Sequence, residues 1–328
     1  MERPPLVSIV TPFYNTDAYL VECIESVLTQ TYPEYEYLLV NNCSTDSSRQ
    51  IAERYARKEG RIRLLNNSEF VGQVANYNGA LERISPDSKY VKIVQADDLI
   101  FPDCVRLMVE LAEQAPTVGI VSSYYVCGGY LDGGGVPLGV SILNGRDASR
   151  TMLSRRLNLT GSPNTVLYRA DIVRSRHPFF PLERCFEDSD AAFEILMHYD
   201  LGYIHQMLSF SRLHRDSILG TVDEFNPLLL HYFIAIETFG KDLFAPEDFA
   251  ELRRRIRKDY FGYLGATMLR RWNRRLWEFH RAGVSTLGQK LSWRDVALPM
   301  LSEAGRLLLN PENTLERIFT QARNRFRR

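Results

Sequence analysis

The sequence predicts an α/β protein with a mostly parallel sheet flanked by helices, followed by an α-helical C-terminal region. In the first 125 residues, β-branched runs alternate with helical patterns about every 25 to 30 residues, as in a parallel sheet with crossover helices. After about residue 223 the pattern is helical throughout and rich in Arg. We therefore expect two domains, residues 1–222 and 223–328, since a single core stops growing beyond roughly 250 to 300 residues.

The expected elements follow from hydrophobic period and from breaker residues. Apolar residues recur at helical spacing over 20–28, after Asn15 or Thr16 as a cap and before Pro33 as a stop. Further helices are expected after Asp46, from Pro102 to near Pro116, and from Glu187 onward. The runs expected to form strands are residues 6–11, 35–41, 61–65, 89–95, 118–125, 164–168 and 203–213.

Glycine is concentrated between residues 127 and 147, which contain seven glycines. The segment lacks the order of a phosphate-binding P-loop and of a dinucleotide-binding turn. We interpret it as a mobile flap or, alternatively, as a plain surface loop.

Composition excludes several classes of protein. The chain has 40 Lys and Arg against 40 Asp and Glu, so its net charge is zero, whereas a dedicated nucleic-acid binder needs a basic excess. Five widely spaced cysteines without a C-x-x-C pair suggest neither a disulfide framework nor a zinc site, and fit a reducing compartment. No run approaches the ~20 apolar residues of a membrane span, and the N-terminal run does not resemble a signal peptide.

Polar and aromatic side chains follow the expected strands at the edge where open parallel sheets bind ligands. They include Pro12 and Tyr14 after the first strand, the turn 42–46 after the second, and Asp97 with Asp98 after the fourth. Two adjacent carboxylates repel each other, and a Mg²⁺ or Mn²⁺ ion that also binds a diphosphate would neutralise them. Alternatively, they only cap the helix that opens at Pro102.

Six motifs occur in an order that resembles a family 2 glycosyltransferase of the GT-A fold, over about residues 5 to 217. Each motif is weak alone, but the ordered set is specific. They are VSIVTPFYN at 7–15, LTQTYP at 28–33, NCSTD at 42–46, VQADD at 94–98 with Pro102 four residues on, the pair Glu187 and Asp188, and Arg212-Leu-His214.

The resemblance implies a role for individual residues. Asn42 would read the base, Asp188 would be the general base beside Glu187, and the cofactor would be Mn²⁺ or Mg²⁺. The donor would be a UDP- or dTDP-sugar, although Asn42 stands where the family often has Asp, and Gln95 and Tyr77 are further departures. The other implied roles are nucleotide binding by Pro12, Tyr14, Asp46 and Asp97, metal binding by Asp98 and His214, and diphosphate binding by Arg212.

The predicted function is an inverting transfer of a sugar to a hydroxyl of a glycan or lipid-linked acceptor, in building a cell-surface polysaccharide. Such attack requires a base for the acceptor proton and a way to absorb charge on the leaving diphosphate. Taken alone, Glu187 and Asp188 could equally be acids at a helix N-terminus, where the dipole favours them. The rival functions are a sugar-nucleotide nucleotidyltransferase and a non-catalytic nucleotide-sugar-binding protein.

Charge is distributed unevenly along the chain. Residues 251–328 contain 18 Lys and Arg against 7 Asp and Glu, and residues 1–250 contain 22 against 33. Basic helices that also carry aromatic residues suit the surface of an anionic bilayer. We therefore expect a cytoplasmic protein with peripheral membrane contact, or helices that pack on the catalytic domain with their arginines solvated or paired.

Overall fold

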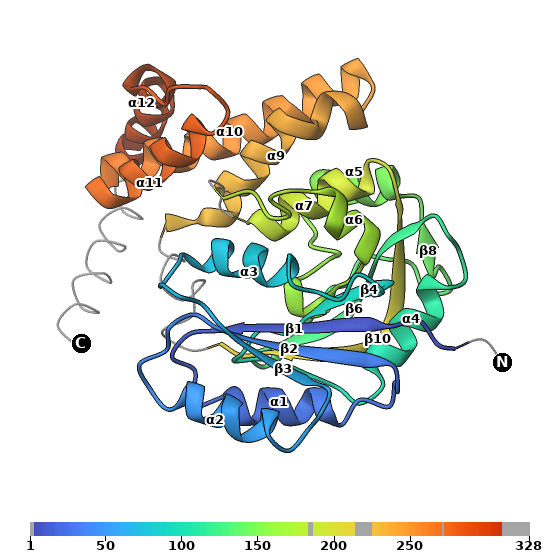
Figure 1. Cartoon of the computed structure of the whole chain (residues 1–328). Coiled ribbons are helices and arrows are strands. Elements are labelled where there is room, and N and C mark those ends of the chain that lie inside the picture. Colours follow the sequence, from blue (N-terminus) through green and yellow to red (C-terminus); the bar gives the residue numbers. More distant parts are fainter. Residues whose placement is uncertain (1–2, 183–185, 214–224, 271, 310–328) are drawn as a thin grey trace. The chain divides into compact units, whose positions relative to one another are not determined.

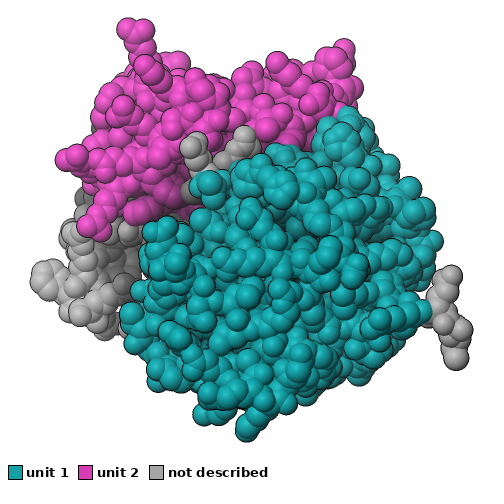
Figure 2. Space-filling model, in the orientation of Figure 1, with its two compact units in different colours: residues 1–221 teal, residues 222–328 magenta. Residues whose placement is uncertain are grey.

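The computed structural model describes residues 3–182, 186–213, 225–270 and 272–309, and it divides the chain into two compact units. Unit 1 is Met1–Thr221 and unit 2 is Val222–Arg328, coloured separately in Figure 2. Figure 1 shows that unit 1 holds the sheet and that unit 2 is helical. Each unit is described by itself below.

The described part of unit 1 contains one ten-stranded sheet, in which β3-β2-β1-β4-β9-β6-β10-β5 form the main path while β7 pairs with β6 and β8 with β10. The strands are β1 (Val7–Phe13), β2 (Tyr35–Asn41), β3 (Ile62–Asn66), β4 (Tyr90–Ile93), β5 (Leu99–Ile100), β6 (Val118–Cys127), β7 (Tyr130–Asp132), β8 (Ile142–Leu143), β9 (Leu167–Arg169) and β10 (Asp200–Ser211).

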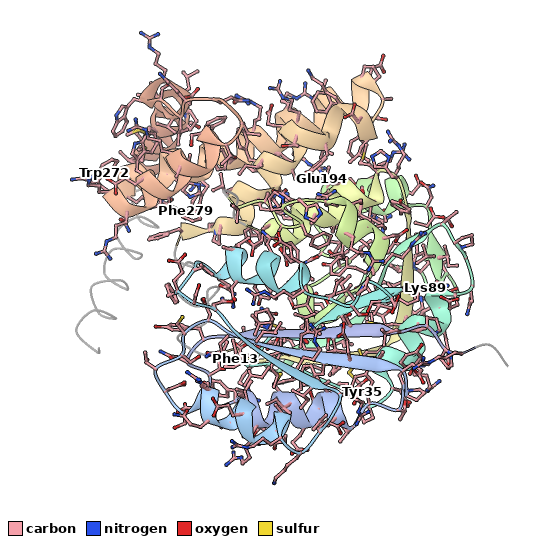
Figure 3. All side chains as sticks on the ribbon, in the orientation of Figure 1. Phe13, Tyr35, Lys89, Glu194, Trp272 and Phe279 are labelled. Carbon is pink, nitrogen blue, oxygen red and sulfur yellow. The ribbon has the colours of Figure 1, made fainter. Side chains whose placement is uncertain are left out.

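The β3-β2-β1-β4 part of the sheet is parallel throughout, as predicted. Figure 3 labels Phe13, the last residue of β1, and Tyr35, the first of β2, at opposite ends of these strands. The expected strand at 164–168 begins instead as a 3₁₀ turn, Pro163–Thr165, and becomes β9, which is antiparallel to both β4 and β6. β10 restores parallel pairing with β6, so the α/β fold class is confirmed with one reversed strand at the sheet centre.

Helices cover both faces of this sheet. Figure 1 shows α1 and α2 on one side of β1–β3 and α3 on the other. The α1 side chains at Leu20, Cys23, Ile24 and Val27 are completely buried, which is the apolar stripe that its helical period predicted. The helices of unit 1 are α1 (Leu20–Leu28), α2 (Ser48–Ala56), α3 (Gln73–Leu81), α4 (Cys104–Ala112), α5 (Gly145–Arg155), α6 (Ala170–Ser175) and α7 (Glu187–Leu196).

The glycine-rich segment is attached to the sheet at several points. Its β7 pairs with β6 and its β8 with β10. The Tyr125 hydroxyl donates to Asp132 over 3.0 Å, and the Tyr203 hydroxyl donates to the carbonyl of Gly133, which has φ 90°. The end of the segment at Gly145 begins α5, with Asn144 as its cap. The interpretation of residues 127–147 as a loop is therefore wrong near both ends of the segment. Mobility of the residues between β7 and β8 stays a prediction.

Unit 2 has a small core of its own. The rings of Phe233 and Tyr260 stack at 4.4 Å, and the Tyr260 hydroxyl lies 3.2 Å from Nδ1 of the buried His280. A Cβ at Gly265 would lie 2.8 Å from Pro299, so α10 and α12 pack closely there. No helix of the described residues is long and apolar enough to cross a membrane. The helices are α9 (Pro227–Leu243), α10 (Pro246–Arg270), α11 (Arg274–Ser285) and α12 (Trp293–Leu309).

Candidate active site

The end of β1 and the turn after β2 are joined by the side chain of Asn15. Its Oδ1 accepts from the Thr45 N–H over 2.8 Å, and its own N–H donates to Ser44 Oγ over 3.1 Å. Pro12 is buried within β1, and Tyr14 follows the strand with 43% of its surface exposed. The structure therefore brings the first two predicted nucleotide-binding segments together at the carboxyl edge of the sheet.

Asp46 serves the same turn as a helix cap. Its carboxylate accepts backbone N–H groups from Ser48 over 2.9 Å and from Asp17 over 3.1 Å. Partial burial raises the pKa of Asp46, but the hydrogen bonds from Ser48 and Asp17 outweigh burial and lower it below its ordinary value. A capping role is sufficient to explain this residue, and its role in nucleotide binding stays a prediction.

Asn42 is buried and fully engaged with the loop that leads to α3. Its Nδ2 donates to the Val71 carbonyl over 2.8 Å, while its Oδ1 accepts from Val71 N–H and Asn67 Nδ2, each over 3.1 Å. The neighbouring Phe70 is 59% exposed, and its ring lies 4.7 Å from that of Tyr14. The sequence analysis did not identify Phe70, because Phe70 lies outside the motifs. Its only indication in the sequence is that it is an apolar residue in a polar loop.

Asp98 directly precedes β5 and is almost completely buried, with 4% of its surface exposed. Its two oxygens accept from the Arg212 N–H over 2.8 Å and from Ser211 Oγ over 3.0 Å. Burial and, secondarily, the charge of Asp97 raise the pKa of Asp98 to about 7, against the lowering effect of those hydrogen bonds. The carboxylate therefore remains short of positive charge. Ser211, at the end of β10, is a second contact that the motifs did not identify.

Several contacts hold Arg212 in place. Its Nε donates to the Asp97 carbonyl over 3.0 Å, and its Nη2 pairs with Glu22 at 2.7 Å. The guanidinium also lies 4.8 Å from the ring centre of Tyr19. It is therefore fixed beside the two aspartates with a carboxylate partner of its own, and its binding of a diphosphate stays a prediction. His214, the predicted metal ligand, lies outside the described residues.

Glu187 and Asp188 form the first turn of α7, after Phe186 in a left-handed conformation. Asp188 Oδ1 accepts from the Ser189 N–H over 2.8 Å. Burial and then the Glu187 charge raise the pKa of Asp188 to about 7, and burial also raises the pKa of Glu187. Acids that merely capped an exposed helix would have lowered pKa values, so desolvation outweighs the helix dipole here.

The charges of Asp98 and Asp188 both influence residues at the end of β6. The Cys127 thiol has its pKa raised by burial and then by the charges of Asp132 and Asp98, while the charge of Asp188 is one of those that raise the pKa of Tyr125 after burial. Asp98 and Asp188 therefore both act on side chains of the last three residues of one strand. Two carboxylates with strongly raised pKa values at the carboxyl edge of an α/β sheet define a candidate active site.

The donor set at Asp98 suits a hard divalent cation. Each carboxylate oxygen has two lone pairs and uses one in the hydrogen bonds above, so one remains on each for a metal. The raised pKa is the expected state of a buried carboxylate that a cation would neutralise. Among the described residues, no three His, Cys, Asp or Glu side chains form a metal-binding group. Asp98 could therefore supply one ligand, and metal binding at this residue stays a prediction.

Comparison with known proteins assigns this chain to a protein family. The model of "Glycosyl transferase family 2" matches residues 8–175. This is more than half of the chain, which therefore belongs to that family. Residues 8–175 include the predicted nucleotide-binding residues, Asp97 and Asp98, but end before Glu187, Asp188 and Arg212.

Two curated relatives each match about a third of the chain. GlyG, a glycosyltransferase of Streptococcus pneumoniae serotype 4, is 31% identical over 120 residues, 37% of this chain and 39% of its own. The putative teichuronic acid biosynthesis glycosyltransferase TuaG of Bacillus subtilis is 38% identical over 94 residues, 29% of this chain and 36% of its own. The chain thus spans little more than a third of each of these relatives.

Solved structures share the fold at low identity. S. aureus TarS 1-349 in complex with UDP-GlcNAc has a TM-score of 0.61 at 17% identity, covering 89% of this chain and 83% of that one. The mannosyltransferase PcManGT of Pyrobaculum calidifontis, in complex with GDP-Man and Mn²⁺, has a TM-score of 0.55 at 19% identity, covering 95% and 83%. The GT-A fold predicted from the motifs is confirmed.

Proposed function

We propose that this protein is an inverting, metal-dependent glycosyltransferase that moves a sugar from a UDP- or dTDP-sugar to a hydroxyl of a glycan or lipid-linked acceptor. The observation that carries the proposal is a pair of carboxylates, the buried Asp98 and the partly buried Asp188, each of which has a pKa of about 7 and acts on a side chain at the end of β6. Support for the donor and for polysaccharide synthesis comes from UDP-GlcNAc in the TarS structure and from the description of TuaG.

Asp188 has the properties that a general base requires. A carboxylate with a pKa near 7 accepts a proton more readily than an ordinary Asp and is still about half ionised at neutral pH. In the proposed reaction Asp188 takes the proton of the acceptor hydroxyl as its oxygen bonds to the anomeric carbon, and the bond to the diphosphate breaks. This single displacement inverts the anomeric centre, so an α-linked donor gives a β-glycoside.

On the opposite side of the reaction, Asp98 would hold a Mn²⁺ or Mg²⁺ ion. The ion, when bound, supplies positive charge that stabilises the departing diphosphate. Arg212, fixed by Asp97 and Glu22, contributes a second positive charge at the same edge. Tyr14, Phe70 and Asn42 would form the nucleotide side of the pocket, with the backbone of Val71 positioned by Asn42.

We further propose that the protein acts at the cytoplasmic face of a membrane through peripheral contact. Its support is the excess of 18 Lys and Arg over 7 Asp and Glu in residues 251–328, which anionic lipid would attract.

The test combines donor binding and transfer for three chains: wild type, Asp98→Asn and Asp188→Asn. Loss of a general base costs about 10²- to 10⁴-fold in rate, so Asp188→Asn is expected to lose transfer at that scale while binding the nucleotide-sugar normally. Asp98→Asn is expected to lose the stimulation of transfer by Mn²⁺. Full transfer by Asp188→Asn would refute the base assignment, and reversal dependent on pyrophosphate would identify a nucleotidyltransferase instead.

A further inference from the structure

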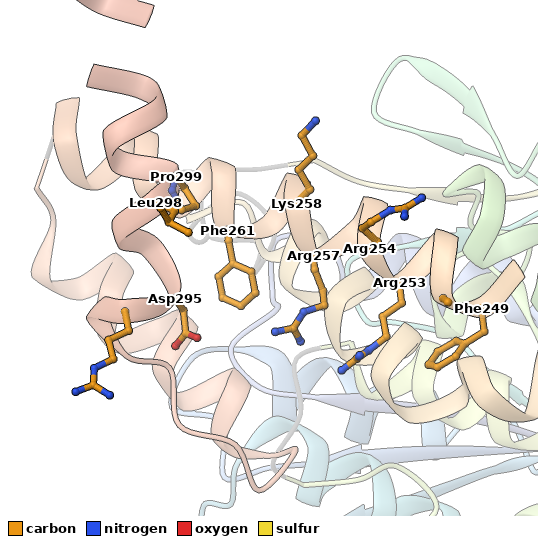
Figure 4. Close-up of a pocket in the computed structure, with 11 residues that line it drawn as sticks. Phe249, Arg253, Arg254, Arg257, Lys258, Phe261, Asp295, Leu298 and Pro299 are labelled. Atoms are coloured by element: carbon orange, nitrogen blue, oxygen red, sulfur yellow. The ribbon is translucent and has the colours of Figure 1, made fainter. Parts of the chain in front are cut away.

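Unit 2 carries a groove of about 580 Å³ along α10 and α12 (Figure 4). Its lining contains one carboxylate, Asp295, together with apolar side chains that include Phe261 and Leu298. The cationic lining residues are Arg253, Arg254, Arg257, Lys258 and Arg294. We call the surface formed by the lining residues the basic groove. All of these residues belong to unit 2.

Part of this positive charge is already neutralised. Arg253 and Arg257 pair with the buried carboxylate of Glu237 at 2.8 and 3.0 Å. The Asp295 carboxylate caps the start of α12, accepting from the N–H and hydroxyl of Ser292 over 2.7 and 2.8 Å. These contacts fix the walls of the groove.

The remaining cations are available to a ligand. Arg254, Lys258 and Arg294 are exposed, and within the described ranges none of them has an ion pair. Arg254 and Lys258 are four residues apart, so they lie on the same side of α10, and Figure 4 shows both extending away from the α10 axis. These three cations leave the groove with a positive charge that an anionic ligand would complement.

Exposed aliphatic side chains lie beside these cations on α12. Leu298, which lines the groove, is 76% exposed, and Leu301, three residues later and thus on the same side, is 69% exposed. Arg294 precedes Leu298 by one helical turn. A helix surface that combines free cations with exposed leucines is suited to the boundary between lipid headgroups and acyl chains, whereas an extended polyanion in water offers nothing to the leucines.

We propose that the basic groove and the two leucines dock onto a bilayer that contains anionic phospholipid. Arg254, Lys258 and Arg294 bind lipid phosphates, and Leu298 and Leu301 enter the headgroup boundary. The proposal rests on the peripheral membrane contact proposed above and names the surface that makes it. It does not depend on the glycosyl transfer proposed for unit 1, because vesicle binding needs neither donor nor metal.

The test is co-sedimentation of the full chain with vesicles of phosphatidylcholine alone or with about 30% phosphatidylglycerol, a typical anionic content. Wild type is expected to bind the anionic vesicles only, and less at high salt. Arg254→Gln with Lys258→Gln should weaken binding about 10- to 30-fold, since each surface cation contributes about 1 kcal/mol. Leu298→Ser with Leu301→Ser should weaken it as well, with no change in salt dependence.

The matched control removes two exposed cations of unit 2 that do not line the groove, Arg275→Gln with Arg281→Gln. It is expected to bind within twofold of wild type. An equal loss in the control would reveal diffuse charge attraction and overturn the docking surface. Absence of vesicle binding by wild type would also overturn it. The same holds if wild type binds soluble polyglutamate but not vesicles and the groove variant loses the binding to polyglutamate. Arg294→Gln serves as the groove variant if the double substitution does not fold, as judged by circular dichroism.

Discussion

At the residue scale, the candidate site holds carboxylates where burial disfavours their charge. Asp98 and Asp188 each have a second acid as a neighbour in sequence, Asp97 and Glu187, and each receives hydrogen bonds that only partly offset desolvation. Buried charge of this kind lowers stability. Because the folded-state pKa is raised, each carboxyl favours folding most at low pH and loses that contribution as pH rises through about 7. Stability therefore does not explain these residues, and the roles proposed for them in transfer would.

The pH dependence of transfer follows from Asp188. A base acts only when deprotonated, so kcat/KM is expected to be level above a pH of about 7 and to fall tenfold per unit below it. Glu187→Gln removes the charge that contributes to the raised pKa and should move the midpoint to lower pH. Initial rates between about pH 5 and pH 9 measure both effects. A midpoint near the ordinary value for Asp, about 4, would exclude Asp188 as the base.

Phe70 is expected to contribute to donor affinity by stacking beside Tyr14. Base stacking on an aromatic ring contributes about 1 to 3 kcal/mol, so Phe70→Ala should raise the Kd of UDP about tenfold and leave kcat at saturating donor nearly unchanged. Isothermal titration measures the affinity. The matched control is Tyr130→Ala, which removes another exposed ring, 79% exposed, on β7. Equal affinities in wild type and Phe70→Ala would remove Phe70 from the pocket.

At the element scale, two neighbouring side chains of α3 contact a segment of unit 1 that is distant in sequence. Asn78 Nδ2 donates to the Phe180 carbonyl and Asn78 Oδ1 accepts the Phe180 N–H, both over 2.8 Å and both buried. The two residues are 102 positions apart. The ring of Tyr77 contacts Phe180 edge-on at 6.1 Å. A paired amide of this kind fixes one backbone position relative to the helix.

Asn78→Ala is expected to lower the free energy of unfolding by about 2 to 4 kcal/mol, because it leaves the Phe180 N–H and carbonyl buried and unsatisfied. Urea denaturation measures the change. Glu82→Ala provides the control, since Glu82 is exposed and directly follows the same helix; it should change stability by less than about 0.5 kcal/mol. Similar values for the two variants would show that the amide pair is not a structural link.

The elements that sequence reasoning predicted well are those with a strong local signal. Residues 35–41 form β2 as predicted, and 20–28 form α1, because burial of one stripe or of a whole strand leaves a visible period. β9 was misjudged in extent and direction, since three residues carry no period and direction depends on the partner strands. β7 and β8 lie among glycines, where pairing with β6 and β10 outweighs low propensity.

The same limit applies to the site. Asp97 and Asp98 could be placed at a strand end from sequence, because the chain itself puts them there. Two hydrogen bonds of the site join segments that are far apart in sequence. Asn42 accepts from Val71, 29 residues away, and Asp98 accepts from Ser211, 113 residues away. Hydrogen-bond partners at such separations leave no periodic trace, so neither the engaged amide nor the exposed Phe70 could be found without the fold.

At the scale of the whole molecule, zero net charge results from cancellation. Residues 1–250 carry 33 acids against 22 Lys and Arg, and residues 251–328 carry the compensating basic excess. Several arginines of unit 2 are paired inside it, including Arg253 and Arg257 with Glu237 and Arg306 with Glu303. The basic excess that remains is therefore carried by groups such as Arg254 and Lys258, which have no such partner in the described structure.

This separation predicts unusual chromatography for a neutral protein. At about 0.1 M salt the Debye length is about 10 Å, so charged regions that are farther apart than this act on a resin separately, and the chain should be retained at pH 7 by both an anion and a cation exchanger. Arg254→Gln with Lys258→Gln should elute earlier from the cation exchanger and no earlier from the anion exchanger, because only the basic region is weakened. Salt at elution measures the effect. Passage of wild type through both resins would mean that the two charge excesses neutralise each other in the folded chain, which would also remove the electrostatic basis for membrane docking.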